Sequence, residues 1–580
     1  MTLEEKRHTL AHLLAAAVLE RYPHAKATIG PAIDTGFYYD FDFGTGEKPG
    51  DADLAALENS MRDMLTSWSE MTGTEVSLKD AQDRFKDNTF KLELIEEIAK
   101  KGERITLYTA GGFTDLCRGG HAEYPAKDIA SDSFALERIA GAYWRGDETK
   151  PMLTRIYGLA FDTKEDLEEY RVQYEEAKKR DHRKLGKELD LFTFSELVGS
   201  GMPLFTPRGT TIRSAIVSFS RELNAELGFG EVHTPNVNKA ELFKISGHYD
   251  KYKEDMLSVR SQYVEDEMFL KPMNCPQHTQ IYASRPRSYR DLPIRYSDFS
   301  ILYRDERPGE LSGLTRLRAF AQDDGHLFCR EDQIENEISN LLVAIQKALK
   351  TYRIDYWMRL SLRDPEKKEK YLGDDATWEQ SQNIMRSLLV EKGIPHKEVA
   401  GEAAFYGPKI DIMAVDALKR EWQISTIQLD FIQPSRFKLE YTAEDGTKKT
   451  PVMIHRALVG SPDRFLGILI EHYAGAFPAW LSPVQVRIVP VSEKHTAYGN
   501  EVLEMLRKAG VRVDIDDTNE SLGKKIRAGK TEKIPYLLVV GDKEIEARTV
   551  SVESRDKGKL DAVSISDFVA TVSEEIKNRA

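Results

Sequence analysis

The sequence has few cysteines, no long apolar run and no excess of positive charge. Only three cysteines, Cys117, Cys275 and Cys329, occur among 580 residues, which excludes a disulfide framework and predicts a reducing, cytoplasmic setting. No stretch approaches the roughly 20 apolar residues of a membrane helix, so we expect no membrane partner. The formal net charge of −13 disfavours nonspecific coating of nucleic acid, which needs clustered Lys and Arg.

The length and composition predict several globular domains. A chain of 580 residues with 41% hydrophobic and 31% charged residues exceeds what one core organises, so about three or four domains are expected. Pattern changes along the chain predict a multidomain α+β and α/β protein with these parts: an α+β domain at 1–158, a solvated linker helix at 159–190, a large unit with antiparallel strands at 191–483, and an α/β domain with a parallel sheet at 484–580.

The stretch HTLAHLL places His8 and His12 one helical turn apart. Histidines at this spacing lie on one face of a helix. They could be metal ligands, catalysts of a hydrolysis, or ordinary side chains, and the spacing alone leaves these alternatives open.

Two arginines flank a loop rich in Gly and Pro in ILYRDERPGELSGLTRLRAF. Arg304 and Arg316 would project from paired strands, and two guanidinium groups make a bidentate fork for phosphate oxygens. Taken alone, they could equally be surface arginines.

Further motifs follow in a fixed order: NCPQH, AFAQDDGH, AFYGPKI, STIQLDF and MIHRALVGS. Residues 219–237, 301–326 and 456–475 resemble motifs 1, 2 and 3 of the class II aminoacyl-tRNA synthetases. Within that class the ordered motifs resemble the threonyl-tRNA synthetase family, and the likeness covers nearly the whole chain. It implies an N-terminal editing domain, a linker helix, a class II antiparallel-sheet catalytic core and a C-terminal α/β anticodon-binding domain.

The resemblance implies ATP-dependent ligation of L-threonine to tRNA(Thr) through a threonyl-adenylate, with Mg²⁺ bound to ATP, in a homodimer. Adenylation needs positioning and charge stabilisation more than a base, which suits a cluster of cations. The residues carried over are Arg304, Arg316, Arg464 and Lys409 for catalysis, Arg304, Glu306, Arg316, Gln423, Ser461 and Arg464 for ATP, and Gln322, Asp324, Tyr406 and Gln428 for threonine.

Cys275, His326 and His455 fall where this family binds one catalytic Zn²⁺ per subunit. One thiolate and two imidazoles suit zinc, and three protein ligands leave an open coordination position. A site that engages the threonine hydroxyl can reject valine by roughly 10⁴ or more, whereas a hydrophobic pocket separates such isosteres by only about 10²-fold.

Serine lacks only one methyl group of threonine, worth about 1–3 kcal/mol, so a hydrolytic site that edits Ser-tRNA(Thr) is expected. The resemblance assigns this editing to His8, His12, Asp115, Cys117 and His121. Histidines with pKa values near neutrality can take part in proton transfer to or from a water. A zinc tetrad of the three histidines and Cys117 remains an alternative on spacing.

The C-terminal residues Asn519 and Glu544 fall at anticodon-reading positions of the family, where amide and carboxylate groups can bond base edges. They could also be ordinary surface residues. Several positions depart from the family pattern, among them Gln277 for Gly, Gly120 for Pro and Glu553 for Arg. Because the chain starts almost directly at HTLAH, we expect the form that lacks the small domain preceding the editing domain.

Two other classes of function compete with this interpretation. A regulatory relative that lost aminoacylation should lack some of Arg304, Arg316, Arg464 and the three zinc-site residues, yet all are present. A metallohydrolase centred on HTLAH would leave the central arginines without a role.

Overall fold

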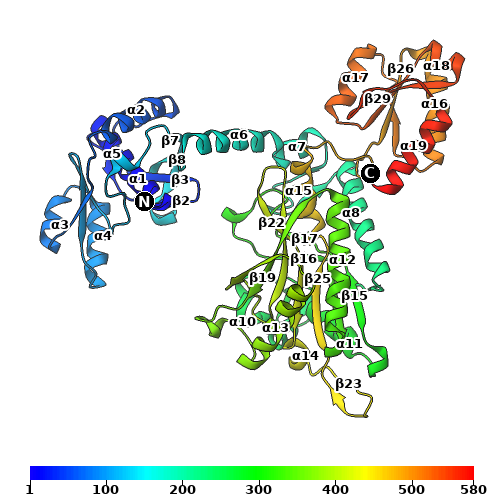
Figure 1. Ribbon diagram of the computed structural model, residues 1–580, viewed down its shortest axis with the longest axis horizontal. Coiled ribbons are helices and arrows are strands. Elements are labelled where there is room, and N and C mark those ends of the chain that lie inside the picture. The colour runs from blue at the N-terminus through cyan, green and yellow to red at the C-terminus, as the bar shows by residue number, and fades with distance from the viewer. The chain divides into compact units, whose positions relative to one another are not determined.

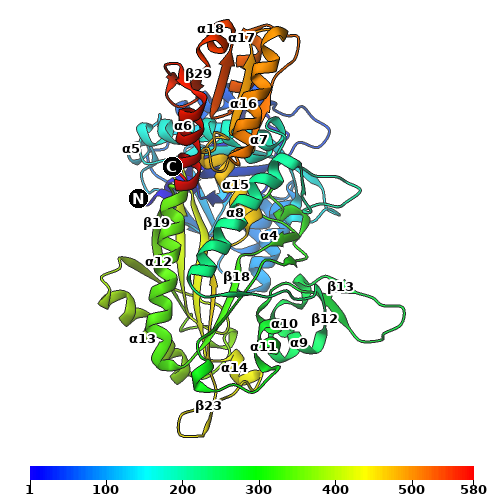
Figure 2. The same cartoon turned by 90° about the vertical axis from the view of Figure 1, so that its right-hand side faces the viewer.

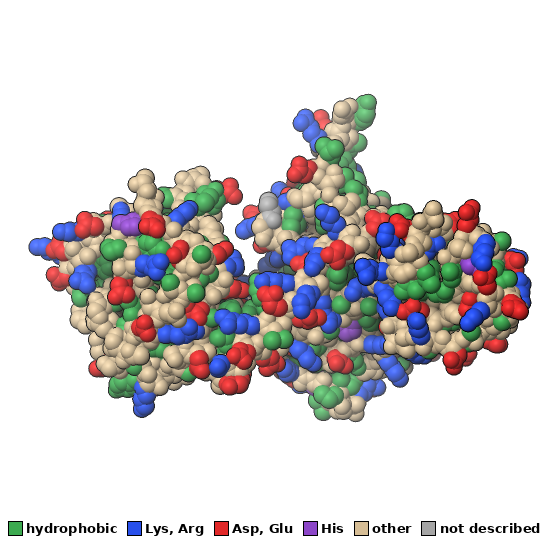
Figure 3. All heavy atoms as spheres, turned by 90° about the horizontal axis from the view of Figure 1, so that it is seen from above, with side chains coloured by type: hydrophobic (Ala, Val, Ile, Leu, Met, Phe, Trp, Pro, Cys, Tyr) green, Lys and Arg blue, Asp and Glu red, His purple; other side chains and the backbone are tan. Residues whose placement is uncertain are grey.

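The computed structural model describes residues 1–580, the side chain of Pro308 excepted. The chain forms two compact units, Met1–Glu175 and Glu176–Ala580, and helix α6 (Lys164–Arg180) spans the boundary between them (Figure 1). Within the described part of the chain, no helix combines the length and the apolar character needed to cross a membrane. In Figure 3, acidic and basic side chains are interspersed over the visible face, without a continuous basic stripe.

The first unit packs helix α1 (Leu3–Arg21) on an antiparallel sheet with the order β1-β3-β8-β7. A capping box between Thr2 and Glu5 begins the helix. Its apolar residues, including Leu10, Leu14 and Val18, are buried in the core of this unit. His8 and His12 therefore come from a helix that is fixed by packing along most of its length.

The remaining elements of this unit include a second antiparallel sheet, β4-β5-β6, which carries Asp115. Their bounds are β1 Lys26–Ala27, β2 Ala32–Ile33, β3 Gly36–Asp42, α2 Leu54–Leu65, β4 Thr72–Glu75, α3 Leu78–Arg84, α4 Thr89–Lys100, β5 Thr106–Ala110, β6 Phe113–Leu116, α5 Pro125–Asp128, β7 Phe134–Tyr143 and β8 Met152–Ala160.

The second unit is built on an eight-stranded sheet with the order β11-β15-β18-β25-β22-β21-β19-β20. Its central pairs are antiparallel, which confirms the predicted antiparallel core, and only β11–β15 and β19–β20 are parallel. Helices α8, α12 and α15 contribute to the main hydrophobic core on this sheet (Figure 2). In the pairing of β18 with β25, His326 lies directly opposite His455.

The elements up to residue 473 have the following bounds: α7 His182–Glu188, β9 Phe192–Thr193, β10 Leu204–Phe205, α8 Pro207–Glu226, β11 Gly230–Glu231, β12 Val237–Lys239, α9 Ala240–Ser246, α10 His248–Tyr252, β13 Ser258–Val259, β14 Met268–Leu270, α11 Cys275–Ala283, β15 Ile294–Asp298, β16 Ile301–Tyr303, β17 Ala319–Ala321, β18 Asp324–Cys329, α12 Ile334–Tyr352, β19 Asp355–Leu362, α13 Asp375–Glu391, β20 His396–Ala400, β21 Lys409–Val415, β22 Glu421–Asp430, α14 Gln433–Arg436, β23 Tyr441–Thr442, β24 Lys448–Lys449, β25 Val452–Ala457 and α15 Pro462–His472.

The C-terminal part is an α/β fold, as predicted, but its sheet is mixed. Strands β26 (Val486–Pro490), β27 (Val513–Ile515) and β28 (Tyr536–Val540) are parallel, whereas β29 (Thr549–Ser554) pairs with β28 antiparallel. The prediction of a parallel sheet is thus wrong for β29. The connection from β28 to β29 holds only the short α18 (Asp542–Ala547), whereas a parallel crossover needs roughly a dozen residues or more. The other elements are α16 Thr496–Lys508, α17 Leu522–Thr531, β30 Gly558–Lys559, β31 Val563–Ser564 and α19 Ile565–Asn578.

The segment predicted as one solvated linker helix contains two helices, α6 and α7. The helix is interrupted at Asp181, whose side chain caps α7 by accepting a hydrogen bond from the N–H of Arg183. Helix α6 buries only Leu167, but α7 buries His182 and Leu185. The prediction of a solvated helix is therefore wrong for α7, because its first residue packs into the second unit.

Candidate functional site

A cavity of about 620 Å³ in the second unit brings Cys275, His326 and His455 together. They come from the first residue of α11 and from the facing strands β18 and β25. All three are buried, and one donor atom of each lies within 4.8 Å of the corresponding atoms of the other two. Residues far apart in the sequence thus form one compact donor set of one sulfur and two nitrogens.

Each of the two imidazoles is held at one nitrogen by a residue outside that donor set. His326 Nδ1 lies 2.8 Å from His278 Nδ1, and His455 Nε2 lies 2.8 Å from Asp430 Oδ2. The other nitrogen of each ring remains for a metal, the usual arrangement around metal-bound histidines. The donor set and its supports therefore fit Zn²⁺. The supporting roles of His278 and Asp430 were not predicted from the sequence, although the two residues lie in the motifs NCPQH and STIQLDF.

Burial favours the uncharged forms of two donors, His326 and Cys275. Burial, reinforced by His278 and His455, holds the pKa of His326 well below its usual value. Burial, reinforced by Asp324 and Asp430, raises the pKa of the Cys275 thiol well above its usual value. A divalent cation would bind the imidazoles directly and would have to displace the thiol proton.

The residues predicted to bind the substrate threonine all line the same cavity: Gln322, Asp324, Tyr406 and Gln428. Asp324 Oδ2 accepts a hydrogen bond of 3.0 Å from Asn274 Nδ2, and burial raises the pKa of its carboxyl. The Tyr406 ring centroid lies 5.0 Å from that of His455. Polar side chains that could bind an amino acid thus line the cavity beside the three donors.

The cavity also contains His248 and Tyr252, which sequence analysis missed. His248 is buried, its Nδ1 lies 2.8 Å from Ser246 Oγ, and burial with nearby cationic groups lowers its pKa to about 3. It therefore presents a neutral imidazole to the cavity. The stretch SGHYDKY carried no signal for this role, because a single histidine on a short helix is common.

An adjoining cavity of about 500 Å³ gathers the predicted arginines. Its lining includes Arg304, Glu306, Arg316, Gln423, Ser461 and Arg464. Burial lowers the pKa of Arg464, and the charges of Arg304 and Arg316 add to this effect. Ser461 caps α15, so the N-terminus of that helix also faces the cavity. Mutually repelling cations at a helix N-terminus are suited to bind phosphate groups.

Two of the predicted cations are held in ion pairs. Arg316 Nε lies 2.8 Å from Glu306 Oε2, and its Nη2 lies 2.8 Å from Glu310 Oε2. Lys409 Nζ lies 2.9 Å from Asp411 Oδ2. Arg316 is half exposed, so its side chain can exchange these carboxylates for another anion.

In the first unit, the predicted editing residues converge. Donor atoms of His8, His12, Cys117 and His121 lie within 4.8 Å of one another. Cys117 Sγ is 3.3 Å from His8 Nε2 and 3.4 Å from His121 Nε2. Asp115 Oδ2 lies 3.1 Å from His12 Nδ1. Helix α1, strand β6 and the segment that follows β6 together form this cluster.

Two buried residues that sequence analysis missed hold Asp115 in place. Lys91 Nζ lies 2.5 Å from Asp115 Oδ1, and the Tyr39 hydroxyl donates to Asp115 Oδ2 at 2.5 Å. Burial opposes ionisation of Asp115, but Lys91 and His12 outweigh it and lower its pKa. Lys91 lies in KLELIEEIAKK, where nothing distinguishes it from exposed lysines.

These contacts set the charges in the cluster. Burial disfavours the charged form of His12, but its close approach to the Asp115 carboxylate and to Cys117 outweighs burial and raises its pKa to about 9. Burial likewise opposes the Cys117 thiolate, but the neighbouring imidazoles of His12, His121 and His8 outweigh burial and lower its pKa to about 3. Burial lowers the pKa of His121. The cluster thus holds a protonated His12, a thiolate and a neutral His121 near neutral pH.

The predicted anticodon residues differ in their surroundings. Asn519 is exposed between β27 and α17. Glu544 uses both carboxylate oxygens within its own domain, accepting from the Gly541 N–H at 2.9 Å and the Ser551 hydroxyl at 2.7 Å. A base that binds Glu544 would have to share these oxygens.

The chain matches known proteins over nearly its full length. Residues 257–473 match the family model of the tRNA synthetase class II core domain (G, H, P, S and T), and residues 485–575 match that of the anticodon binding domain. With its antiparallel core and its two cavities, the chain is a class II aminoacyl-tRNA synthetase.

The chain is 47% identical to the threonine–tRNA ligase of Rubrobacter xylanophilus, over 99% of this chain and 89% of the relative. It is 46% identical to that of Deinococcus radiodurans, with the same two coverages. A crystal structure described as the RNA binding domain of threonyl-tRNA synthetase from Cryptosporidium parvum Iowa II superposes with a TM-score of 0.65 at 38% identity, covering 68% of this chain and 98% of that one. The chain belongs to the threonine–tRNA ligase family, whose members charge tRNA with threonine.

Proposed function

We propose that Cys275, His326 and His455 hold one zinc ion per subunit, and that Gln322, Asp324, Tyr406 and Gln428 bind threonine beside it. When bound, zinc would supply open coordination for the amine and hydroxyl of threonine, and valine lacks the hydroxyl. The observation that carries this proposal is the donor set of one thiol and two imidazoles, each ring supported by a residue at its other nitrogen.

The adjoining cavity of arginines would bind ATP with its Mg²⁺. A carboxylate oxygen of threonine attacks the α-phosphorus, a new C–O–P linkage forms, and the bond to pyrophosphate breaks. Arg304 would hold the α-phosphate, while Arg316 and Arg464 would neutralise the leaving pyrophosphate. Glu306, Gln423 and Ser461 would contact the nucleotide, and Lys409 would add a further cation. The proposed catalysis rests on positioning and on charge stabilisation.

The cluster of His8, His12, Asp115, Cys117 and His121 would hydrolyse Ser-tRNA(Thr). A neutral His121 can take a proton from water as the oxygen attacks the ester carbonyl, and a protonated His12 can stabilise the negative charge that develops there. The ester C–O bond then breaks, and the proton passes to the leaving tRNA hydroxyl. A metal ion at His8, His12, Cys117 and His121 is the second candidate, favoured by the same convergence of donor atoms.

The proposal extends to the domain bounds, the anticodon contacts and the assembly of the protein. We infer an editing domain at 1–158, a linker at 159–190, a catalytic domain at 191–483 and an anticodon-binding domain at 484–580. Asn519 and Glu544 would contact the anticodon of tRNA(Thr). The protein would act in the cytoplasm as a homodimer, the assembly that class II membership suggests.

Threonine-dependent exchange of pyrophosphate into ATP tests the central proposal. The purified protein should catalyse exchange and contain about one zinc per chain, whereas Cys275→Ala should lose both. Cys329→Ala is the matched control, because Cys329 is also a buried thiol but lies outside the donor set. Full exchange by a zinc-free Cys275→Ala protein would overturn the zinc assignment.

A further inference from the structure

His182, the first residue of α7, lies in a buried polar cluster outside the proposed substrate contacts. Its Nδ1 lies 2.5 Å from Glu471 Oε1, and its backbone N–H donates to the same oxygen at 3.0 Å. On the other side of the ring, the backbone N–H of Leu314 donates to Nε2 at 2.9 Å. The imidazole thus joins helix α15 to the loop that precedes Arg316.

The hydrogen bonds fix the tautomer of this ring. Because Leu314 N–H is a donor, Nε2 must carry the lone pair, so the proton sits on Nδ1 and is donated to Glu471. The loop also fits closely around the ring. Gly313 has φ +49°, and a Cβ added there would lie 2.1 Å from His182 Nε2. A glycine is therefore needed where the loop meets the ring.

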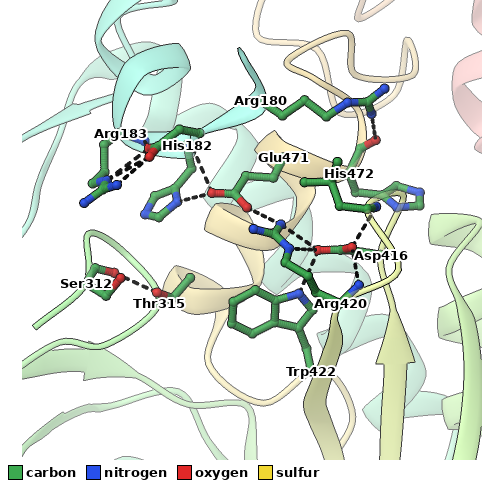
Figure 4. Close-up of polar contacts among 12 residues, drawn as sticks. Arg180, His182, Arg183, Ser312, Thr315, Asp416, Arg420, Trp422, Glu471 and His472 are labelled. Atoms are coloured by element: carbon green, nitrogen blue, oxygen red, sulfur yellow. Dashed lines mark hydrogen bonds and ion pairs between the residues drawn. The ribbon is translucent and has the colours of Figure 1, made fainter. Parts of the chain in front are cut away.

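The cluster continues from Glu471 toward a second part of the ATP cavity. Glu471 Oε2 accepts from Arg420, and Arg420 also pairs with Asp416 (Figure 4). The Trp422 indole N–H donates to Asp416 at 2.9 Å, and the Arg464 guanidinium lies 5.6 Å from the Trp422 ring centroid. One buried carboxylate, Glu471, is thus linked through His182 to Leu314 and through Arg420 to the support of Arg464.

The cluster is not arranged as a metal site. Asp181, His182 and Glu471 offer donor atoms within 4.8 Å of one another. However, both ring nitrogens of His182 already have partners, and the Asp181 carboxylate pairs with Arg183 at 2.5 Å. The cluster instead connects parts of the polypeptide to one another.

We infer that His182 is a positioning residue for ATP, because it holds the loop of Leu314 and Arg316 at the nucleotide cavity. Leu314, Thr315 and Arg316 all line that cavity. The inference rests on the proposed function of this cavity as the ATP site. His182 is not among the residues that line either cavity, whereas the loop it holds lines the nucleotide cavity. Its effect should therefore fall on the KM for ATP and not on threonine binding.

Two substitutions separate the two sides of the ring. In His182→Asn, the side-chain amide can still donate to Glu471 but is too short to accept from Leu314. In His182→Gln, the longer side chain can place its carbonyl oxygen near the position of Nε2 and accept from Leu314. Loss of one neutral hydrogen bond corresponds to about a three- to tenfold change in an equilibrium. We expect His182→Asn to raise the KM for ATP in pyrophosphate exchange by about that factor.

The KM for threonine should stay near the parent value in His182→Asn, and His182→Gln should recover most of the ATP affinity. Gly313→Ala tests the same contact from the loop side and should also raise the KM for ATP. Lys184→Gln, an exposed position on α7, is the matched control. Exchange without tRNA keeps any tRNA contact of α7 out of the measurement.

Equal changes in the KM for ATP and for threonine, or no difference between the Asn and Gln variants, would overturn the inference. A lowered Tm with unchanged KM values would assign His182 a purely structural role and also overturn it. Failure of the ATP site itself gives a different result, because Arg464→Ala would then leave the KM and kcat of exchange unchanged.

Discussion

The ring of His455 is held by Asp430, whose Oδ2 lies 2.8 Å from Nε2. The other oxygen of this carboxylate accepts the backbone N–H groups of Ile432 and Gln433 at 2.8 and 2.9 Å. Asp430 is fully buried, so it fixes both the start of α14 and the orientation of the imidazole. Nε2 of His455 donates its proton to the carboxylate, which leaves the lone pair of Nδ1 for a metal.

Asp430→Asn should therefore weaken zinc binding. The asparagine oxygen would remain with the two backbone N–H groups, so its amide would point a donor at Nε2 of His455. The ring would then carry its proton on Nδ1, where the metal must bind. We expect zinc affinity to fall about 10- to 100-fold, measured by competition with a chromogenic chelator. Asp445→Asn, in the exposed β23–β24 turn, should retain parent affinity. Unchanged affinity in Asp430→Asn would contradict the assigned tautomer.

Editing should depend on pH through His121 and His12. Burial lowers the pKa of His121, so this base is neutral except at acidic pH. The pKa of His12 is raised to about 9, so its proton is lost only as the pH rises through that value. Hydrolysis of Ser-tRNA should thus be level near neutrality and fall above pH about 9. The stability that protonated His12 contributes has the same sign, being complete below pH 6.5 and lost as the pH rises through about 9.

Asp115→Asn provides the test of this pH profile. Removing the negative charge lowers the pKa of His12, so the alkaline fall in hydrolysis should move to lower pH. Rates are corrected for spontaneous hydrolysis of the ester without enzyme. Asp128→Asn, an exposed carboxylate on α5, should keep the parent profile. If hydrolysis by Asp115→Asn fell at the same alkaline pH as in the parent, loss of the His12 proton could not be the cause of that fall.

Lys91→Met should impair editing and leave threonine activation intact. Methionine keeps an unbranched side chain, one atom shorter than that of lysine, but removes one of the two cations beside the buried Asp115. Breaking such a buried ion pair lowers the free energy of unfolding of the first unit by about 3–5 kcal/mol. Clearance of Ser-tRNA measures the effect on editing. Hydrogen exchange of the α1 amides in the full-length protein measures the stability of the first unit. Pyrophosphate exchange belongs to the second unit and should stay constant. Lys100→Met, exposed on the same helix, is the control.

The motif order predicted the class. The strand-like runs of the central unit predicted the antiparallel core, and the alternation of strand and helix patterns after residue 484 predicted the α/β tail. The sequence could not show how strand pairing completes the sites. His278 and Asp430 become partners of the zinc-site histidines only through the packing of α11 and β22 against β18 and β25. Lys91 on helix α4 reaches Asp115 on strand β6.

The same limitation applies to the linker and the tail. The stretch DHRKLGKEL is typical of an exposed basic surface, yet its histidine is buried. Glu471 and Leu314, from distant segments, supply hydrogen-bond partners for the two ring nitrogens of His182. Glu544 matches an anticodon position, but the cap that it forms with Gly541 appears only in three dimensions. Local pattern predicted the elements, whereas long-range hydrogen bonds determined which polar residues are buried.

Arg464→Ala should separate activity from stability. Burial lowers the pKa of this guanidinium, with the charges of Arg304 and Arg316 adding to the effect, and its Nε has no hydrogen-bond partner among the described residues. Removing the cation relieves that repulsion, so the Tm should hold or rise. The kcat of pyrophosphate exchange should nevertheless fall by about 10²–10³-fold, because charge on the leaving pyrophosphate loses a preorganised partner. Arg386→Ala, whose partly exposed side chain pairs with Glu398 at the surface, should change neither quantity. A destabilised Arg464→Ala protein with parent exchange rates would show that the guanidinium serves packing instead of phosphate binding.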